Sequence, residues 1–182
     1  MGALAQAEVG DYVNKYFVSS YQKISNFTIK GNGQKQGGNV ASYFCTPDGR
    51  VLHAVAGPVG GKKFLQEVRW VEETWKLTEL HEVKTLDQLQ ALFRAAHLER
   101  LAKELNVTMP RNQLPELEAA TVTTAIRGPY VNLLLSKSAN QQAQVHLLLA
   151  AYTAPKLARV YDTVFATILN QEVSTAPVVA KK

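Results

Sequence analysis

The feature that most constrains the fold is a turn between two β-rich segments in residues 39–56. The segments "NVASYFC" and "GRVLHAVA" flank the tetrapeptide "TPDG". Pro47 presets its own φ angle, and Asp48 and Gly49 are residues that tight turns favour. Two short apolar segments separated by such a turn are typical of paired antiparallel strands. The sequence therefore predicts a β-hairpin over residues 39–56.

Helical periodicity follows the predicted hairpin. Apolar residues recur at spacings of three and four from Gly60 onward, and again after Thr85. We expect Thr85 or its neighbour to cap the second helix. Two further helices are predicted, one over residues 141–151 and one from Leu157. The three amphipathic stripes are Phe64, Leu65, Val68, Val71 and Trp75; Leu86, Leu89, Leu92, Phe93, Ala96, Leu101 and Leu105; and Leu157, Val160, Tyr161, Val164, Phe165, Ile168 and Leu169.

The segment before the hairpin is less regular. Apolar spacing predicts a helix over residues 3–16 that is broken or capped near Gly10, and β-rich composition then predicts a strand over residues 17–24. Residues 30–39 contain four glycines without periodicity and are expected to form a loop. For residues 106–137 we expect irregular structure with a short strand, while a second hairpin and an interrupted helix remain alternatives.

Length and composition limit the fold class. A chain of 182 residues that is 46% hydrophobic can bury a real core, which excludes a disordered chain. We expect an α/β domain in residues 1–80, a mostly helical extension packed on it in residues 81–174, and a flexible tail in residues 175–182. No apolar run approaches the length of a membrane span.

Charge and cysteine content exclude several functions. The net charge is +5, but the basic residues are spread along the chain, so we expect no nucleic-acid partner. Cys45 is the sole cysteine, which excludes an intrachain disulfide, a two-thiol redox centre and a cysteine-rich zinc site. The opening "MGALAQAE" contains Ala-Gln-Ala, which is either a trimmed export signal, with an extracytoplasmic location, or an ordinary alanine-rich helix start.

The block "NVASYFCTPDGRVLHAVAGPVGGKKFLQEVRW" resembles the C-terminal half of thioredoxin-like domains. In that family a hairpin with a D-G type turn forms the sheet edge, and a glycine after its second strand starts the last helix. "VNKYFVSSYQKI" is similar to the end of the family's active-site helix and the strand that follows it. The resemblance covers residues 9–78 and implies a truncated or rearranged thioredoxin-like sheet with packed helices.

The chain departs from the family at both parts of the redox apparatus. The region that matches the Cys-x-x-Cys motif, around Gly2 to Glu8, contains no cysteine. The family's cis-proline would fall near Gly38 or Asn39, and it is absent too. A dithiol mechanism needs a reactive thiol and a resolving cysteine, so this chain cannot perform one. In the family a central strand precedes the active-site helix, but only about eight residues precede that helix here. The sheet would therefore keep an exposed apolar edge, from which we predict a homodimer or another protein partner.

The stretch "VLHAVAGPVGGKK" in residues 51–63 resembles a strand, a glycine-rich turn and a helix start of the kind that holds phosphate. It fails the Walker pattern, because Ala56 stands at the first glycine and Lys63 at the magnesium-binding Ser/Thr. A weaker anion-binding site at the helix start remains an alternative to a simple turn. Its residues would be Gly60, Gly61, Lys62 and Lys63.

No catalytic, metal or cofactor site is predicted from the remaining titratable residues. His53, His81, His97 and His146 lie far apart, so the fold would have to assemble any metal site. We expect Cys45 to be a buried structural residue. Glu72 and Glu73, "HEV" at residues 81–83 and "HLER" at residues 97–100 could form acid–base pairs, but we expect each on a solvated helix face. Glu67 is likewise expected off the apolar stripe of its helix.

These observations predict a non-catalytic thioredoxin-like protein that acts as a protein-interaction or assembly module. One alternative is a fragment of a thiol-disulfide oxidoreductase whose Cys-x-x-Cys lies upstream of the chain. Another is a protein that binds an anion or phosphate ligand through residues 60–63.

Overall fold

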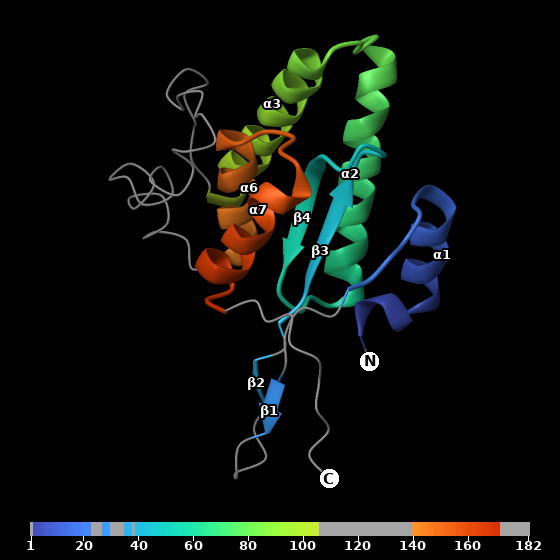
Figure 1. Cartoon of the computed structure of the whole chain (residues 1–182). Helices are drawn as coiled ribbons and strands as arrows, with labels where there is room; N and C mark the ends of the chain where they lie inside the picture. The colour runs from blue at the N-terminus through green and yellow to red at the C-terminus, as the bar shows by residue number, and fades with distance from the viewer. Residues whose placement is uncertain (1, 23–26, 30–34, 38, 106–139, 172–182) are drawn as a thin grey trace.

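The structure is a computed structural model that describes residues 2–22, 27–29, 35–37, 39–105 and 140–171. These residues form a mixed α/β fold with two small antiparallel sheets, β1 (Phe27–Ile29) with β2 (Lys35–Gly37) and β3 (Ala41–Cys45) with β4 (Val51–Ala56), and the second of these lies among the helices (Figure 1). The helical elements before the second hairpin are η1 (Ala3–Ala5) and α1 (Ala7–Tyr16). The later elements are α2 (Gly61–Leu80), α3 (Leu86–Leu105), α6 (Gln141–Ala151), α7 (Leu157–Thr163) and the π-helical η3 (Val164–Ile168).

The predicted hairpin is confirmed as β3 and β4, which pair in antiparallel register from Ala41 opposite Ala56 to Phe44 opposite His53. The turn depends on Gly49, whose φ of +77° is a conformation that other residues adopt at a cost. The Thr46 hydroxyl accepts a hydrogen bond from the Arg50 amide at 3.0 Å, and this bond closes the turn. Local chemistry therefore explains the hairpin.

Helices cover both faces of β4, and all six of its residues are buried. Val55 packs with Phe44 and with apolar residues of α1 and α2, whereas Ala54 and Ala56 pack with α3, α6, α7 and η3. Alternate residues of a strand point to opposite faces, so β4 is a central layer between two helical layers. Such a strand has no face on which an unpaired polar side chain could meet solvent.

The predicted helices after the hairpin are confirmed. Thr85 caps α3. Its hydroxyl accepts a hydrogen bond from the backbone N–H of Gln88 at 3.2 Å, and the side-chain oxygen of Gln88 accepts one from the backbone N–H of Thr85 at 3.1 Å. On the second and third stripes, Phe93, Val160 and Phe165 are among the buried residues. On the first stripe, Trp75 stays 37% exposed.

Three expectations for the first 40 residues need correction. The helix α1 runs through Gly10 without a break. Residues 17–22 of the predicted strand are not in a strand, and Val18 and Tyr21 are fully exposed. The predicted loop at 30–39 contains β2, which pairs with β1. The predictions for residues 106–137 and for the tail lie outside the described residues.

One apolar cluster joins the two predicted domains. Val51 and Ala54, from the first, pack in the same cluster as Leu101, Leu148 and Phe165, from the second. The helices after residue 80 thus pack on the hairpin, while the domain boundary at residue 80 stays a prediction. None of the described helices is long and apolar enough to cross a membrane.

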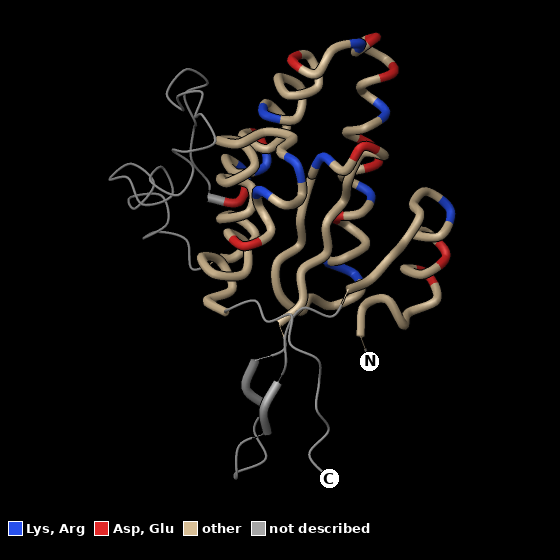
Figure 2. Tube along the Cα trace, in the orientation of Figure 1, with Lys and Arg blue, Asp and Glu red and all other residues tan. Residues whose placement is uncertain are grey.

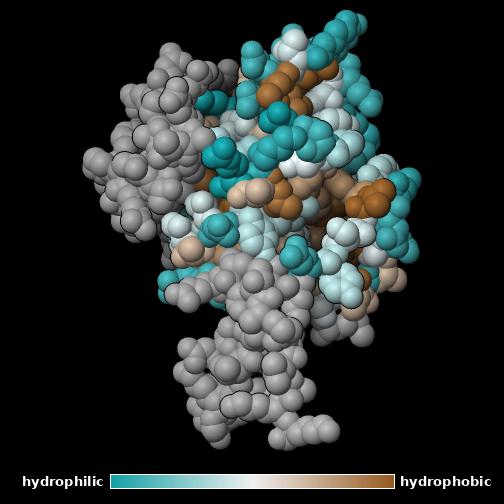
Figure 3. Space-filling view, in the orientation of Figure 1, coloured by the Kyte–Doolittle hydropathy of each residue, from teal (hydrophilic) through white to brown (hydrophobic). Residues whose placement is uncertain are grey.

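The surface of the described part shows no dominant charge. Acidic and basic residues alternate along α2 and α3 (Figure 2). On the face shown in Figure 3, hydrophobic residues lie in small separate groups among hydrophilic ones. The interior, by contrast, contains several buried polar side chains, among them three histidines.

Candidate functional site

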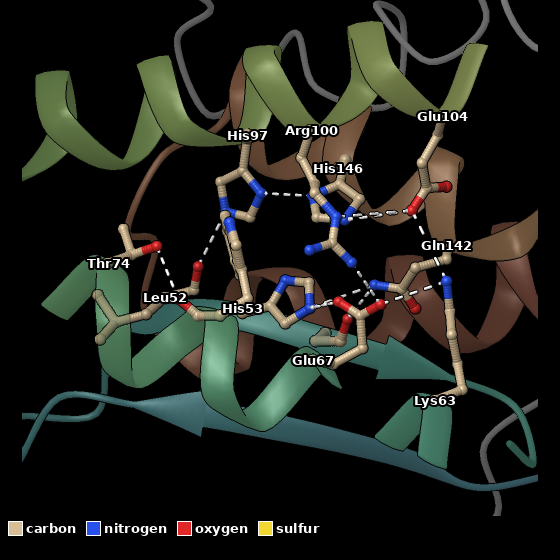
Figure 4. Close-up of polar contacts among 12 residues, drawn as sticks. Leu52, His53, Lys63, Glu67, Thr74, His97, Arg100, Glu104, Gln142 and His146 are labelled. Carbon is tan, nitrogen blue, oxygen red and sulfur yellow. Dashed lines mark hydrogen bonds and ion pairs between the residues drawn. The ribbon is translucent and has the colours of Figure 1, made fainter. Parts of the chain in front are cut away.

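Three histidines meet in the interior, from three elements that are distant in sequence. His53 comes from β4, His97 from α3 and His146 from α6, and their exposed fractions are 0%, 1% and 0%. One nitrogen of each ring lies within 4.8 Å of one nitrogen of each other ring (Figure 4). Trp70 of α2 packs against all three rings. We call these three residues the histidine cluster.

The hydrogen bonds of His97 determine where its proton lies. Its Nε2 is 2.9 Å from the carbonyl oxygen of Leu52, and a carbonyl can only accept, so Nε2 carries the proton. In the neutral ring Nδ1 is then an acceptor. The His146 Nδ1 lies 2.9 Å away and must therefore donate its proton to His97 Nδ1. In neutral His146 this arrangement leaves Nε2 without a proton.

His53 is oriented by a buried carboxylate. Its Nε2 lies 3.1 Å from Glu67 Oε2, and both side chains are fully buried. The Gln142 amide nitrogen is 3.3 Å from the same Nε2, but it donates to the Ala54 carbonyl at 2.8 Å. An ionised carboxylate can only accept, so the proton lies on Nε2, directed to Glu67. The Nδ1 of His53 is consequently a free acceptor.

Unsatisfied polar atoms concentrate at this site. Among the described residues, the buried side-chain atoms without a hydrogen-bond partner are His53 Nδ1, His146 Nε2, Glu104 Oε1 and the Tyr43 hydroxyl. Three of these four belong to the histidine cluster or contact it. Buried polar atoms in folded proteins are nearly always paired, because each unpaired one costs about 1–3 kcal/mol. The cluster thus lacks a binding partner for several of its atoms.

A group of ion pairs separates the histidine cluster from solvent. Glu67 accepts from Arg100 at 2.8 Å and lies 3.4 Å from the Lys63 ammonium. Glu104 is 3.9 Å from each of these two cations, and its other oxygen accepts from Asn140 at 2.9 Å. The exposed side-chain fraction rises from 0% at Glu67 to 23% at Arg100 and 44% at Lys63. The polar path to the surface therefore runs past Arg100 and Lys63.

Burial keeps the three rings uncharged at neutral pH. It lowers the pKa of His97 to about 3 and the pKa of His146 well below its usual value. Burial also lowers the pKa of His53, although the hydrogen bond to Glu67 opposes it. Burial by itself would raise the pKa of Glu67, but the bond from His53 and the nearby Arg100 charge outweigh it, so the carboxyl is ionised.

Neutral imidazoles with free nitrogen lone pairs are ligands for Zn²⁺ and for other divalent transition metals. Zinc–nitrogen bonds of 2.0–2.1 Å place two ligand nitrogens about 3.4 Å apart, so a pair at the 4.8 Å limit of the histidine cluster would close by about 1.4 Å on binding. General acid–base catalysis at neutral pH fits poorly, because the pKa of about 3 makes His97 a weak base that carries no proton to donate at pH 7.

The predicted anion-binding residues lie near the histidine cluster but do not form one surface. At Gly61, an added Cβ would lie 1.9 Å from the Gln6 side-chain oxygen, so Gln6 covers the start of α2. Lys63 is directed to Glu67 and Glu104, whereas Lys62 is exposed. Binding of an anion at Gly60 to Lys63 stays a prediction, and these contacts leave it little free surface.

Several titratable residues are not where the sequence pattern placed them. Glu67, Glu72 and His97 were expected on solvated helix faces but are buried, because α2 and α3 are covered on more than one side. Cys45 was expected to be buried and is exposed, because the strand bulges between Phe44 and Cys45.

A signal for the histidine cluster does exist in the sequence. His97 stands four residues after Phe93 and four before Leu101, on the apolar stripe itself. His53 interrupts "VLHAVA" and His146 interrupts "VHLLLAA", both otherwise apolar. A polar residue at a core position needs a partner, but the pattern does not say that the three share one.

Comparison with known proteins leaves the geometry as the guide to function. No protein-family model, no curated protein and no solved structure matches the chain. The class of protein must therefore be argued from the histidine cluster itself.

Proposed function

We propose that the chain binds one divalent transition-metal ion, with Zn²⁺ as the reference, through His53, His97 and His146. The single observation that carries this proposal is the set of buried atoms that lack partners around three neutral imidazoles. The sequence analysis expected no metal, because no two of these histidines are close in the chain. Their meeting is a consequence of the fold.

Two of the three rings are already arranged as ligands. His97 and His53 each place their proton on Nε2, against the Leu52 carbonyl and the Glu67 carboxylate. The lone pair of His53 Nδ1 is therefore free to bind a cation, and that of His97 Nδ1 becomes available once His146 gives up the proton it donates there. Metal-binding histidines usually donate their second nitrogen to a carbonyl or carboxylate in this way, which fixes the ring and its tautomer.

The proposed role of the ion is structural. It would join β4, α3 and α6, whose sequence separation makes their docking costly in chain entropy. The complete burial of the three rings supports a role in stability rather than in turnover. We therefore retain the expectation of a non-catalytic protein, and we propose a thioredoxin-like scaffold for protein interaction as its wider context. The homodimer stays a prediction.

Zinc titration of the chelator-treated chain tests the proposal. We expect binding of one Zn²⁺ per chain and a higher melting temperature in its presence. His53→Ala, His97→Ala and His146→Ala should each abolish tight binding. His81→Ala is the matched control, because His81 is the exposed fourth histidine at the end of α2. Equal losses in His81→Ala and in the other variants would contradict the proposal.

Loss of folding in an alanine variant must be separated from loss of ligation. Co²⁺ gives a visible spectrum that reports nitrogen ligands directly, so the wild-type chain alone suffices for this measurement. We expect a spectrum typical of four-coordinate Co²⁺ at one equivalent. A wild-type chain that binds neither ion would overturn the metal site whatever the variants do.

A further inference from the structure

We propose that metal binding moves the proton of His146 from Nδ1 to Nε2, and that Glu104 is the positioning residue that holds the ring in this metal-bound tautomer. The inference rests on the proposed metal binding. It assigns a role to a carboxylate oxygen that is buried and, among the described residues, without a hydrogen-bond partner, although Lys63 and Arg100 lie 3.9 Å from it.

The metal-free tautomer of His146 follows from its neighbour. His97 Nδ1 accepts at 2.9 Å, because its own Nε2 donates to the Leu52 carbonyl. His146 therefore carries its proton on Nδ1, and its Nε2 has nothing to donate. This explains why Glu104 Oε1 lies 3.9 Å from that Nε2, which is beyond hydrogen-bond distance. Two acceptors face one another and stay apart.

A metal ion reverses this arrangement. The nitrogen of His146 that faces His97 is Nδ1, at 2.9 Å from His97 Nδ1, so we take Nδ1 as the ligand atom of His146. An Nδ1 atom that binds a cation must give up its proton, and a neutral ring then carries its proton on Nε2. One proton leaves Nδ1 and one is taken up at Nε2, both by exchange with water, so the ring stays neutral. The new Nε2–H is a donor directed at Glu104 Oε1. An approach of about 1 Å turns the 3.9 Å separation into a hydrogen bond of ordinary length.

Glu104 is held in place for this role. Its second oxygen accepts from Asn140 at 2.9 Å, and Asn140 caps α6, the helix that carries His146. Lys63 and Arg100 lie 3.9 Å from Oε1, so neither makes a close hydrogen bond to it. The same ion thus gives partners to His53 Nδ1 directly and to His146 Nε2 and Glu104 Oε1 through the tautomer change (Figure 4).

Nuclear magnetic resonance of the chain with ¹⁵N-labelled histidine tests the tautomer. Long-range proton–nitrogen correlations should show His146 protonated at Nδ1 without metal and at Nε2 with one equivalent of Zn²⁺. A His146 that keeps its proton on Nδ1 in the zinc-bound chain would overturn the inference while leaving metal binding intact. Absence of zinc binding would instead overturn the proposed function, so the two failures are distinguishable.

Variants of Glu104 test its part separately. Glu104→Ala should weaken zinc binding about 10- to 100-fold, the range found for partners that orient metal ligands. Glu104→Gln should restore much of this loss, because its amide oxygen still accepts a hydrogen bond. Glu104→Ala should also lower the melting temperature of the metal-free chain, because it removes the hydrogen bond that Asn140 donates to Oε2. Glu104→Gln should lower it less, because its amide oxygen can still accept from Asn140.

The matched control is Glu99→Ala, on the same helix, where the carboxylate is exposed and pairs with Lys103. Its zinc affinity should equal that of the wild type. A Glu104→Ala variant that binds zinc as tightly as Glu99→Ala would remove Glu104 from the site. So would a Glu104→Ala variant whose metal-free chain loses stability in proportion to its loss of affinity, because that result indicates a purely structural role.

Discussion

Two groups of ion pairs in this protein use the same kinds of side chain in opposite surroundings. At the hairpin turn, Asp48 pairs with Arg50 and with Lys156, the residue before α7, and its side chain is 56% exposed. In the interior, Glu67 pairs with His53, Arg100 and Lys63 and is fully buried. Both groups link parts of the chain that are distant in sequence. The first is surrounded by water and the second by side chains.

Burial rather than the number of contacts determines what each group can do. Water screens exposed ion pairs, which typically contribute 0–1 kcal/mol. A buried charge that loses its partner leaves an uncompensated charge in a medium that solvates it poorly. Hydrogen bonds from Lys156 and Thr46 lower the pKa of Asp48 to about 2 while leaving it on the surface. The Glu67 group instead fixes the orientation of His53 and therefore the properties of the histidine cluster.

The largest expected effect is that of removing the central buried carboxylate. Glu67→Ala leaves Arg100 and Lys63 without their shared partner and His53 Nε2 without its acceptor. We expect a loss of about 3–5 kcal/mol in the free energy of unfolding, measured by urea denaturation of the metal-free chain. A loss below about 1 kcal/mol would show that the buried group behaves like the one on the surface.

A smaller effect is expected from adding the proposed ion. At a free Zn²⁺ concentration 100 times the dissociation constant, binding to the folded chain alone adds about 2.7 kcal/mol to the free energy of unfolding. The same titration of His97→Ala should add nothing, provided that circular dichroism shows the variant folded. Equal stabilisation of the wild type and this variant would place the zinc elsewhere.

As the pH falls, the histidine cluster should lower the free energy of unfolding before the ion pairs at the hairpin turn do. The pKa of His97 is about 3 in the folded chain and near 6.5 when the chain is unfolded, so between these values only the unfolded chain takes up the proton. The free energy of unfolding of the metal-free chain should therefore fall as pH decreases from 6.5 toward 3, by up to about 1.4 kcal/mol per pH unit for this residue.

Denaturation at pH 7, 6, 5 and 4 measures this slope, and the His81→Ala variant should show the same one. The pKa of Asp48 is depressed, so its contribution is present above its unfolded value near 3.8 and is lost only as pH falls toward 2. A stability that is constant between pH 7 and pH 5 would contradict the uncharged state of the histidine cluster.

The smallest effect is expected at the hairpin turn. Asp48→Ala removes the exposed partner of Lys156 and Arg50, and we expect it to change the free energy of unfolding far less than Glu67→Ala does, because water screens the pair. Its effect should decrease further in 0.5 M salt, because salt screens exposed charges. An effect as large as that of Glu67→Ala would remove the distinction between the two groups.

Features that depend on residues close together in the sequence were predicted more successfully than features that depend on distant ones. The turn at "TPDG" and the cap by Thr85 depend on residues within four positions of one another, and both were predicted correctly. The strand expected over residues 17–24 failed in its described part, because composition favours a strand but a partner must be present to form it. The prediction that Glu67 lies on a solvated helix face was wrong, because that side of α2 contacts both β4 and α3, through His53 and Arg100.

The sequence alone determined the hairpin, the helices that follow it, their apolar stripes and the lack of a dithiol centre. Each of these depends on local backbone preferences, on hydrophobic periodicity or on the presence of a residue type. Only the tertiary structure decided that His53, His97 and His146 share one buried space with Glu67 and Glu104. Their approach is produced by the packing of β4 with α3 and α6, and no periodicity within any one element encodes it.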